Sequence, residues 1–153
     1  MDSGRGYVTD AEMQAIGTAL RSMAGLREIL VSGGDPLVAS DHTVATLLST
    51  LRSAVPGVCL RICTRTPVVL PSRITPELVD LSKAGGPTWF AVHVNHPAEL
   101  SAGTQEAFRR LISAGIPVAT QTVLLRGIND ATDTLERRSE EHTSELQSLS
   151  HLV

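Results

Sequence analysis

Four short apolar segments of the chain carry, at or near their ends, residues that suit ligand binding better than core packing. The residues are Ser32, Gly33, Gly34 and Asp35 on the first segment, Arg65 after the second, His93 and Asn95 on the third, and Gln121 on the fourth. Together they supply hydrogen-bond donors, acceptors and charges of both signs. Such side chains and main-chain groups are suited to bind one small polar ligand that carries an ammonium or a carboxylate group.

Each of these residues also has an ordinary structural interpretation. The glycine pair lets a ligand approach the main chain because no Cβ blocks access, yet a Ser-Gly-Gly-Asp turn is also common between a strand and a helix. A lone strand histidine is often a satisfied core residue. Alternation along the strand places Asn95 on the same face as His93, which favours a binding role for both. Gln121 needs a partner for its amide, either a ligand or a neighbouring side chain.

Arg65 has two competing interpretations. Its guanidinium group either binds an anion or pairs with an acidic neighbour. Arg65 precedes Thr66-Pro67, and this sequence predicts an extended main chain at that point.

The apolar pattern predicts four helices that alternate with four strands. Apolar residues at helical spacing, capping side chains and closing glycines define the helices. Short apolar, β-branched runs define the strands. The predicted helices are Asp10–Met23, a segment capped by Ser40 and stopped by Pro56-Gly57, a segment opened by Thr75-Pro76 and ending at Lys83, and Ser101–Ala114; the predicted strands are Glu28–Ser32, Val58–Thr64, Thr88–Val94 and Pro117–Leu125.

Strict alternation of helices and strands predicts an α/β fold with a parallel sheet covered by helices. Four βα units make about half of an eight-unit barrel, so we expect a partial TIM-type (βα) barrel with parallel strands. Ligands of such folds bind at the carboxyl ends of the strands. The polar residues of all four segments lie at or near those ends.

Composition limits the classes of partner. The chain has 153 residues, of which 42% are hydrophobic, and a net charge of −3. This charge predicts neither a nucleic-acid partner nor an anionic membrane. No apolar run reaches the roughly 18 residues of a spanning helix, and the start of the chain does not resemble a secretion signal. We therefore expect a soluble, cytoplasmic protein.

The spacing of the two cysteines matches part of an iron–sulfur motif. Cys59 and Cys63 have the first spacing of CxxxCxxC, but the third position is Thr66. Their segment is predicted to be a strand, whereas a cluster needs a curved loop of thiolates. On a strand the two sulfurs lie about 13 Å apart, too far for a disulfide. We expect buried core thiols and no metal ligands in this chain.

The end of the chain is predicted to be non-native. Residues 138–148, RSEEHTSELQS, resemble the conceptual translation of a sequencing-library adapter; the alternative is a charged, solvated helix end. We therefore predict a partial barrel domain over residues 1–137 and an adapter-derived tail over residues 138–153. This interpretation removes His142 and His151 from the candidate ligands. It also predicts that the chain is an internal fragment of a longer protein.

Four blocks of sequence resemble segments of the lysine 2,3-aminomutase family of radical S-adenosylmethionine enzymes, in the order and approximate spacing of that family. The blocks are ILVSGGDPL (29–37), LRICTRTPVVLPSRITPEL (60–78), VHVNHPAEL (92–100) and AGIPVATQTVLLRGIND (114–130). The resemblance extends from about Val8 to Leu135. Each block by itself is a weak signal, and the four together make a chance match improbable.

The resemblance implies a partial barrel that binds S-adenosylmethionine, a [4Fe-4S] cluster and pyridoxal 5′-phosphate. It implies that a 5′-deoxyadenosyl radical abstracts a β-hydrogen and that the amino group moves from C2 to C3 through the pyridoxal ring, with L-lysine as the expected substrate. By the same resemblance, Ser32, Gly33, Gly34 and Asp35 contact the methionyl part of S-adenosylmethionine. His93, Asn95 and Gln121 line the same pocket, and Arg65 is a less specific match.

The resemblance also implies that essential parts lie outside this chain. The cluster cysteines are expected before Met1, and the pyridoxal lysine and substrate-selecting acidic residues after Leu135. We therefore expect this polypeptide to be catalytically inactive by itself. An amino acid substrate and an electron donor for the cluster are the implied partners, and a homo-oligomer is compatible with the sequence.

Several functions remain as alternatives to a free-lysine 2,3-aminomutase. One is the related enzyme that makes β-lysine for elongation factor P, and another is a glutamate-directed relative. A non-radical barrel enzyme would use Gly33-Gly34 as a phosphate-binding loop. A non-catalytic α/β binding module would bind its partner without S-adenosylmethionine.

Overall fold

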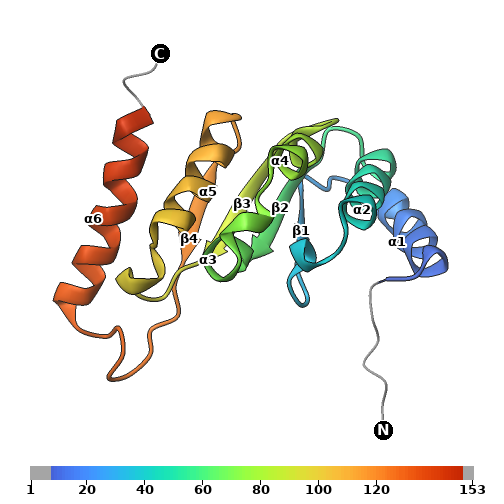
Figure 1. Ribbon diagram of the computed structural model, residues 1–153. Helices are drawn as coiled ribbons and strands as arrows, with labels where there is room; N and C mark the ends of the chain where they lie inside the picture. Colours follow the sequence, from blue (N-terminus) through green and yellow to red (C-terminus); the bar gives the residue numbers. More distant parts are fainter. Residues whose placement is uncertain (1–7, 150–153) are drawn as a thin grey trace, which may run out of the picture.

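The computed structural model describes residues 8–149, in which helices alternate with four strands (Figure 1). The strands are β1 (Glu28–Val31), β2 (Cys59–Thr64), β3 (Thr88–His93) and β4 (Val118–Gln121). The α-helices are α1 (Asp10–Ser22), α2 (Asp41–Ala54), α3 (Thr66–Val69), α4 (Pro76–Lys83), α5 (Ala102–Ser113) and α6 (Thr132–Leu149). Single 3₁₀ turns form η1 (Pro36–Val38), η2 (Pro71–Arg73) and η3 (Pro97–Glu99). All eight predicted segments are present.

The helices begin where the capping side chains predict. Thr9 and Glu12 form a reciprocal capping box at the start of α1. The hydroxyl groups of Ser40, Thr75 and Ser101 each accept a hydrogen bond from the main-chain N–H three residues further on. These bonds satisfy donors that the first turn of a helix leaves without a partner, so local chemistry determines where the helices start.

The sheet is fully parallel, and its strands lie in the order β1-β2-β3-β4. Val31 is aligned with Ile62, Cys63 with Ala91, and His93 with Gln121. Because every strand runs in the same direction, the four carboxyl ends lie along one edge. The residues that follow those ends are thereby brought close together.

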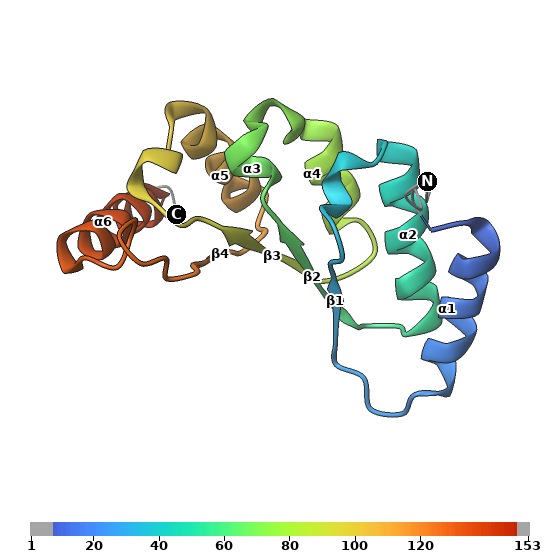
Figure 2. The same ribbon diagram turned by 90° about the horizontal axis from the view of Figure 1, so that it is seen from below.

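Helices α1, α2, α4 and α5 all lie on one side of the sheet (Figure 2). The strand residues on that side, which include Leu60, Ile62, Phe90 and Val92, are almost completely buried. Within residues 8–149 no helix covers the opposite face, and residues on it such as Arg61 are only half-buried. Sequential parallel strands with helices on one side form a section of a (βα) barrel. The predicted fold class is confirmed.

The prediction that both cysteines are buried core thiols is wrong. Cys59 and Cys63 are free and half-buried. They lie on the same face of β2 as Arg61, whereas Leu60 and Ile62 face the helices. Strand alternation places the two thiols on the face that no helix covers, and this face decides their exposure.

Two local predictions also differ from the structure. The main chain at Arg65 is helical rather than extended, with φ −112° and ψ −5°, and Thr66 begins the short helix α3. Strand β4 ends at Gln121, four residues before the predicted end. In the first case, the main-chain N–H groups of Arg65 and Thr66 donate hydrogen bonds to Asp35 Oδ2. These bonds outweigh the preference for an extended main chain that Pro67 imposes on the residue before it, Thr66.

The end of the chain continues the last helix. Residues 132–149 form α6, which includes most of the predicted tail, while the side chain of His142 and all of His151 lie outside the described residues. The adapter origin of residues 138–153 remains a prediction. No helix between residues 8 and 149 has the length and apolarity to cross a membrane.

Candidate functional site

The ends of β1, β2 and β3 enclose a cavity of about 470 Å³. It is lined by Ser32, Gly33, Gly34, Asp35, Cys63, Thr64, Arg65, His93, Asn95 and Val123. Every residue predicted to form the site is among them except Gln121. The cavity therefore unites positions that are up to 91 residues apart in the sequence, from Ser32 to Val123.

Gln121 lies beside this cavity without lining it. It is aligned with His93 on the neighbouring strand, and its main-chain carbonyl accepts a hydrogen bond from Val94 N–H at 3.0 Å. Its side chain is exposed to solvent. An exposed amide can bond to water, so the expectation that Gln121 needs a protein or ligand partner does not hold in this structure.

The two glycines at the end of β1 hold a backbone conformation that other residues avoid. Gly33 and Gly34 both have φ of +91°. A Cβ added at either position would meet no atom within 4 Å. Steric crowding therefore does not explain why glycine occupies these positions. The left-handed backbone conformation explains it. The turn presents bare main chain to the cavity.

Asp35 connects this turn to the end of β2. Its Oδ1 accepts hydrogen bonds from Thr64 Oγ1 at 2.7 Å and from Leu37 N at 3.1 Å. Its Oδ2 accepts from Thr64 Oγ1 at 2.8 Å, from Arg65 N at 2.7 Å and from Thr66 N at 3.0 Å. Both carboxylate oxygens are thus engaged by the chain itself, and this geometry suits a residue that positions the turn.

Arg65 pairs with an acidic neighbour, as one of its two interpretations predicts. Its Nη2 donates to Glu99 Oε1 at 2.7 Å. Glu99 Oε2 in turn accepts from the main-chain N–H of Asn95 at 2.8 Å. The glutamate therefore joins the ends of β2 and β3, and it leaves nearly half of the arginine side chain exposed.

Asn95 and His93 form the wall on the β3 side. Asn95 Oδ1 accepts from Val123 N at 3.0 Å, while its main-chain carbonyl accepts from Asn129 Nδ2 at 2.7 Å. The His93 ring makes no hydrogen bond with another residue in the part of the chain that the structure describes. Its nitrogens are available to a ligand in the cavity.

Sequence reasoning missed two residues that organise this edge. Glu99 lies four residues beyond Asn95, and Asn129 is fully buried in the loop after β4. Asn129 accepts from Leu125 N at 2.6 Å and donates to Val123 O at 2.9 Å. These bonds show that Asn129 holds the loop after β4 in place. The sequence carries no signal that Glu99 would reach back to two strand ends.

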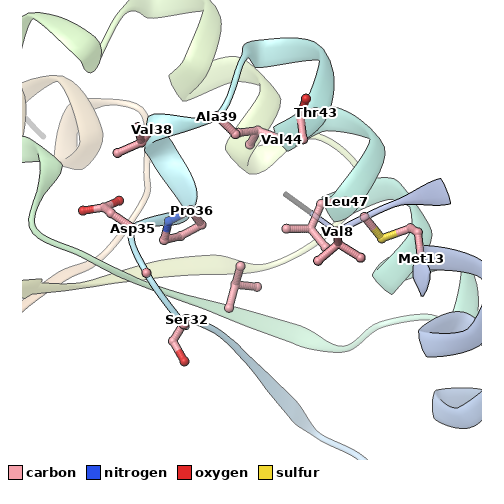
Figure 3. Close-up of a pocket in the computed structure, with 13 residues that line it drawn as sticks. Val8, Met13, Ser32, Asp35, Pro36, Val38, Ala39, Thr43, Val44 and Leu47 are labelled. Carbon is pink, nitrogen blue, oxygen red and sulfur yellow. The ribbon is translucent and has the colours of Figure 1, made fainter. Parts of the chain in front are cut away.

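A second, larger cavity of about 510 Å³ lies on the other side of the same turn. Its lining is mainly apolar and includes Val8, Met13 and Leu47 (Figure 3). In Figure 3 the carboxylate of Asp35 points away from these side chains. The charged and polar groups converge on the smaller cavity, so we take that cavity as the candidate site.

A separate polar cluster lies on the uncovered face of the sheet. Arg61 donates to both carboxylate oxygens of Glu28, its guanidinium carbon lies 4.5 Å from the centre of the Trp89 ring, and Trp89 Nε1 donates to Glu28 Oε1 at 2.9 Å. The hydrogen bond from Trp89 is the main factor that lowers the pKa of Glu28. Arg61 adds to the effect, whereas burial opposes it. The cluster ties together the first three strands.

The candidate cavity has the groups to hold S-adenosylmethionine. A space of about 470 Å³ is faced by bare main chain at Gly33 and Gly34, by the guanidinium of Arg65 and by the ring of His93, which bonds to no other described residue. This volume is within the usual range of small-molecule sites, and the polar groups can meet both the amino acid and nucleoside ends of such a ligand.

Within residues 8–149 no set of side chains suits the cluster, and the lysine there lies away from the candidate cavity. Among the described residues, no three His, Cys, Asp or Glu side chains are close enough to bind a metal ion. The sequence has one lysine, Lys83, which lies in α4 and pairs with Asp80. Lys83 lines a hollow with Cys59 and Thr88, the first residues of β2 and β3, at the opposite edge of the sheet.

Several curated proteins are similar to the chain over most of its length. No protein-family model matches the chain. The chain is 47% identical over 113 residues to L-lysine 2,3-aminomutase of Fusobacterium nucleatum, an alignment that covers 73% of this chain and 26% of the relative. The corresponding enzyme of Clostridium subterminale is 43% identical over 117 residues, or 76% of this chain and 28% of the relative. The chain belongs to the lysine 2,3-aminomutase family.

This aminomutase-family chain also matches a relative with another named substrate. Glutamate 2,3-aminomutase of Clostridioides difficile is 38% identical over 111 residues, which cover 72% of the chain and 26% of the relative. The chain spans between 26% and 37% of the length of the curated relatives it matches. It therefore corresponds to about a third of such an enzyme or less.

Proposed function

We propose that the chain forms part of the S-adenosylmethionine site of a radical aminomutase that moves an amino group from C2 to C3 of an amino acid. The observation that carries this proposal is the cavity shared by the turn after β1, Arg65 after β2, and His93 and Asn95 on β3. It lies where (βα) barrels bind their ligands. The names of the relatives supply the class of reaction.

Each residue of the cavity has its own proposed role in binding the ligand. Main-chain groups at Gly33 and Gly34 face the amino acid end of the ligand, and Asp35 holds their turn against β2. Arg65 offers positive charge, while His93 and Asn95 line the wall on β3. These residues would hold S-adenosylmethionine, which would supply the radical chemistry of the whole enzyme.

The remaining machinery must come from other residues of the whole enzyme. The described residues offer no set of cluster thiolates, and Lys83 lies at the wrong edge of the sheet for a pyridoxal imine near the cavity. We therefore propose that this polypeptide binds S-adenosylmethionine but is inactive by itself. An electron donor and cytoplasmic localisation belong to the same proposal for the whole enzyme.

We favour L-lysine over L-glutamate as the substrate of that enzyme. The relatives named for L-lysine are 36% to 47% identical to the chain, and the glutamate-named relative, at 38%, lies within that range. The preference therefore rests on the names of the more similar relatives, at 42% to 47% identity, which are all lysine names. Each amino acid can be tested as a substrate of the whole enzyme, supplied with S-adenosylmethionine, pyridoxal phosphate and a reductant. Conversion of L-glutamate but not L-lysine would overturn the preference. The related enzyme that makes β-lysine for elongation factor P carries out the same reaction on L-lysine, so this experiment does not separate it from a free-lysine 2,3-aminomutase.

The geometry disfavours a phosphate-binding loop at the glycine pair. Phosphate loops offer free main-chain N–H groups at the start of a helix. Here Asp35 follows the glycine pair, and the turn η1 then begins with Pro36, which has no N–H, while the N–H of Leu37 is already bonded to Asp35 Oδ1. We therefore expect inorganic phosphate not to compete for this cavity.

Calorimetric titration of the 153-residue chain with S-adenosylmethionine tests the proposal. We expect saturable binding at one site, weakened roughly ten-fold in His93→Ala through loss of a polar contact. His42→Ala is the matched control because His42 is exposed near the start of α2, away from the cavity. Absence of binding by the unmodified chain, or equal weakening by both substitutions, would refute it.

A further inference from the structure

Glu99 bridges two strand ends of the candidate cavity without lining it. Its Oε1 accepts from Arg65 Nη2 at 2.7 Å and its Oε2 accepts from Asn95 N at 2.8 Å. The carboxylate is largely shielded, with 22% of the side chain exposed. Each of its oxygens thus holds one of the cavity-lining residues in place.

The bond from Glu99 fixes how Arg65 faces the cavity. A guanidinium group has five N–H donors in one plane, and Glu99 takes a donor at Nη2. The side chain is 47% exposed, and no other side-chain hydrogen bond joins Arg65 to a residue within the described range. A planar donor group anchored at one end is suited to bind a carboxylate with the donors that remain.

The other acidic group of the cavity is not available to compete for Arg65. Both oxygens of Asp35 accept hydrogen bonds from Leu37, Thr64, Arg65 N and Thr66. The His93 ring carries no negative charge. A ligand carboxylate beside Arg65 would therefore meet a guanidinium whose acidic partner lies outside the cavity lining.

We propose that Glu99 is a positioning residue that orients Arg65 to bind the carboxylate of the ligand's amino acid end. The inference rests on the proposed S-adenosylmethionine site and adds the group by which the cavity selects a carboxylate. It predicts that substitution of Glu99 weakens the binding of ligands that carry this carboxylate. The affinity for ligands that lack the carboxylate should stay unchanged.

Paired titrations of the 153-residue chain separate these effects. The probes are S-adenosylmethionine and 5′-methylthioadenosine, which keeps the nucleoside and sulfur but has no amino acid. Glu99→Gln retains an oxygen for Asn95 N–H but loses the charge that holds Arg65. We expect it to weaken S-adenosylmethionine binding about ten-fold and to change 5′-methylthioadenosine binding less than two-fold.

Glu106→Gln is the matched control. Glu106 also pairs with arginines, Arg109 and Arg110, but on the outer surface of α5. It should leave both affinities unchanged, and circular dichroism melting should show that both variants fold. Arg65→Gln should reproduce the selective loss.

The outcomes distinguish the two proposals. If the unmodified chain binds S-adenosylmethionine and Glu99→Gln weakens neither ligand, or weakens both equally, the role of Glu99 is refuted and the proposed function stands. If the unmodified chain does not bind S-adenosylmethionine, both proposals fail together. Selective loss in Glu99→Gln and Arg65→Gln, with none in Glu106→Gln, supports the inference.

Discussion

Asp35, just after β1, and Thr64, the last residue of β2, are joined by the Thr64 hydroxyl, which lies 2.7 Å and 2.8 Å from the two carboxylate oxygens. Thr64 is 2% exposed. The same hydroxyl also accepts from Thr66 N at 2.9 Å. The pair therefore connects the glycine turn, the end of β2 and the start of α3. This contact joins two residues that line the cavity and holds the glycine turn against the end of β2.

Removal of the Thr64 hydroxyl should destabilise the fold. Thr64→Val keeps the shape but loses the bonds to Asp35 and Thr66, at a cost of about 1–3 kcal/mol in the free energy of unfolding. Urea denaturation measures this change. Thr64→Ser should recover most of it, and Thr18→Val, at an exposed position of α1, should change it by less than about 0.5 kcal/mol. An unaltered midpoint in Thr64→Val would contradict the structural role.

Alanine at the glycine turn should cost stability through the backbone and not through crowding. At Gly33 or Gly34 the φ of +91° makes any L-residue strained, and we expect a loss of about 1–3 kcal/mol by urea denaturation. Gly17→Ala is the control within helix α1, where the nearest outside atom would lie at 3.5 Å. That substitution should be neutral or stabilising by up to about 1 kcal/mol. Equal effects at Gly17 and Gly34 would rule out backbone strain.

Titration of Glu28 should depend on Trp89. The hydrogen bond from Trp89 is the largest cause of the lowered pKa of Glu28, so Trp89→Phe should raise that pKa toward its ordinary value. Because the folded pKa lies below the unfolded one, ionised Glu28 stabilises the fold at neutral pH. This stabilisation disappears as the pH falls through the folded pKa, which lies below the ordinary pKa of a glutamate. Trp89→Phe should therefore lose less stability on acidification.

Carbon-13 NMR of the side-chain carboxyl groups measures the effect residue by residue. Glu12 provides an internal control, since its pKa is lowered mainly by the main-chain N–H of Thr9. The substitution should move the Glu28 titration and leave the Glu12 titration in place. Identical Glu28 curves with and without the indole would show that another group sets its pKa.

Reconstitution with iron and sulfide should not load a stoichiometric [4Fe-4S] cluster onto this chain. The sequence has two cysteines, and their four-residue separation along β2 keeps the thiols apart. Iron bound per chain should remain well below four and should not change in a Cys59→Ser, Cys63→Ser double variant. A stoichiometric cluster lost in that variant would contradict the absence of cluster ligands.

The sequence by itself determined the alternation of helices and strands and the residues at the strand ends. Capping by Thr9, Ser40, Thr75 and Ser101 involves neighbours three residues away, so local chemistry suffices to predict where those helices begin. The parallel sheet follows from the same pattern, because apolar β-branched strands between helices have few other ways to become buried. Most of the candidate site could be predicted from these elements.

Only the tertiary structure decided which partners the polar groups take. Asp35 bonds to residues about 30 positions away, and Glu99 to Arg65 across 34 positions, contacts that no local period encodes. Folding also left one face of the sheet uncovered within residues 8–149. For that reason Cys63 is half-buried and not a core thiol, and Gln121 is solvated beside the cavity it was expected to line. The chain pattern sets which residues reach the edge, but the packing of distant segments sets what each one contacts.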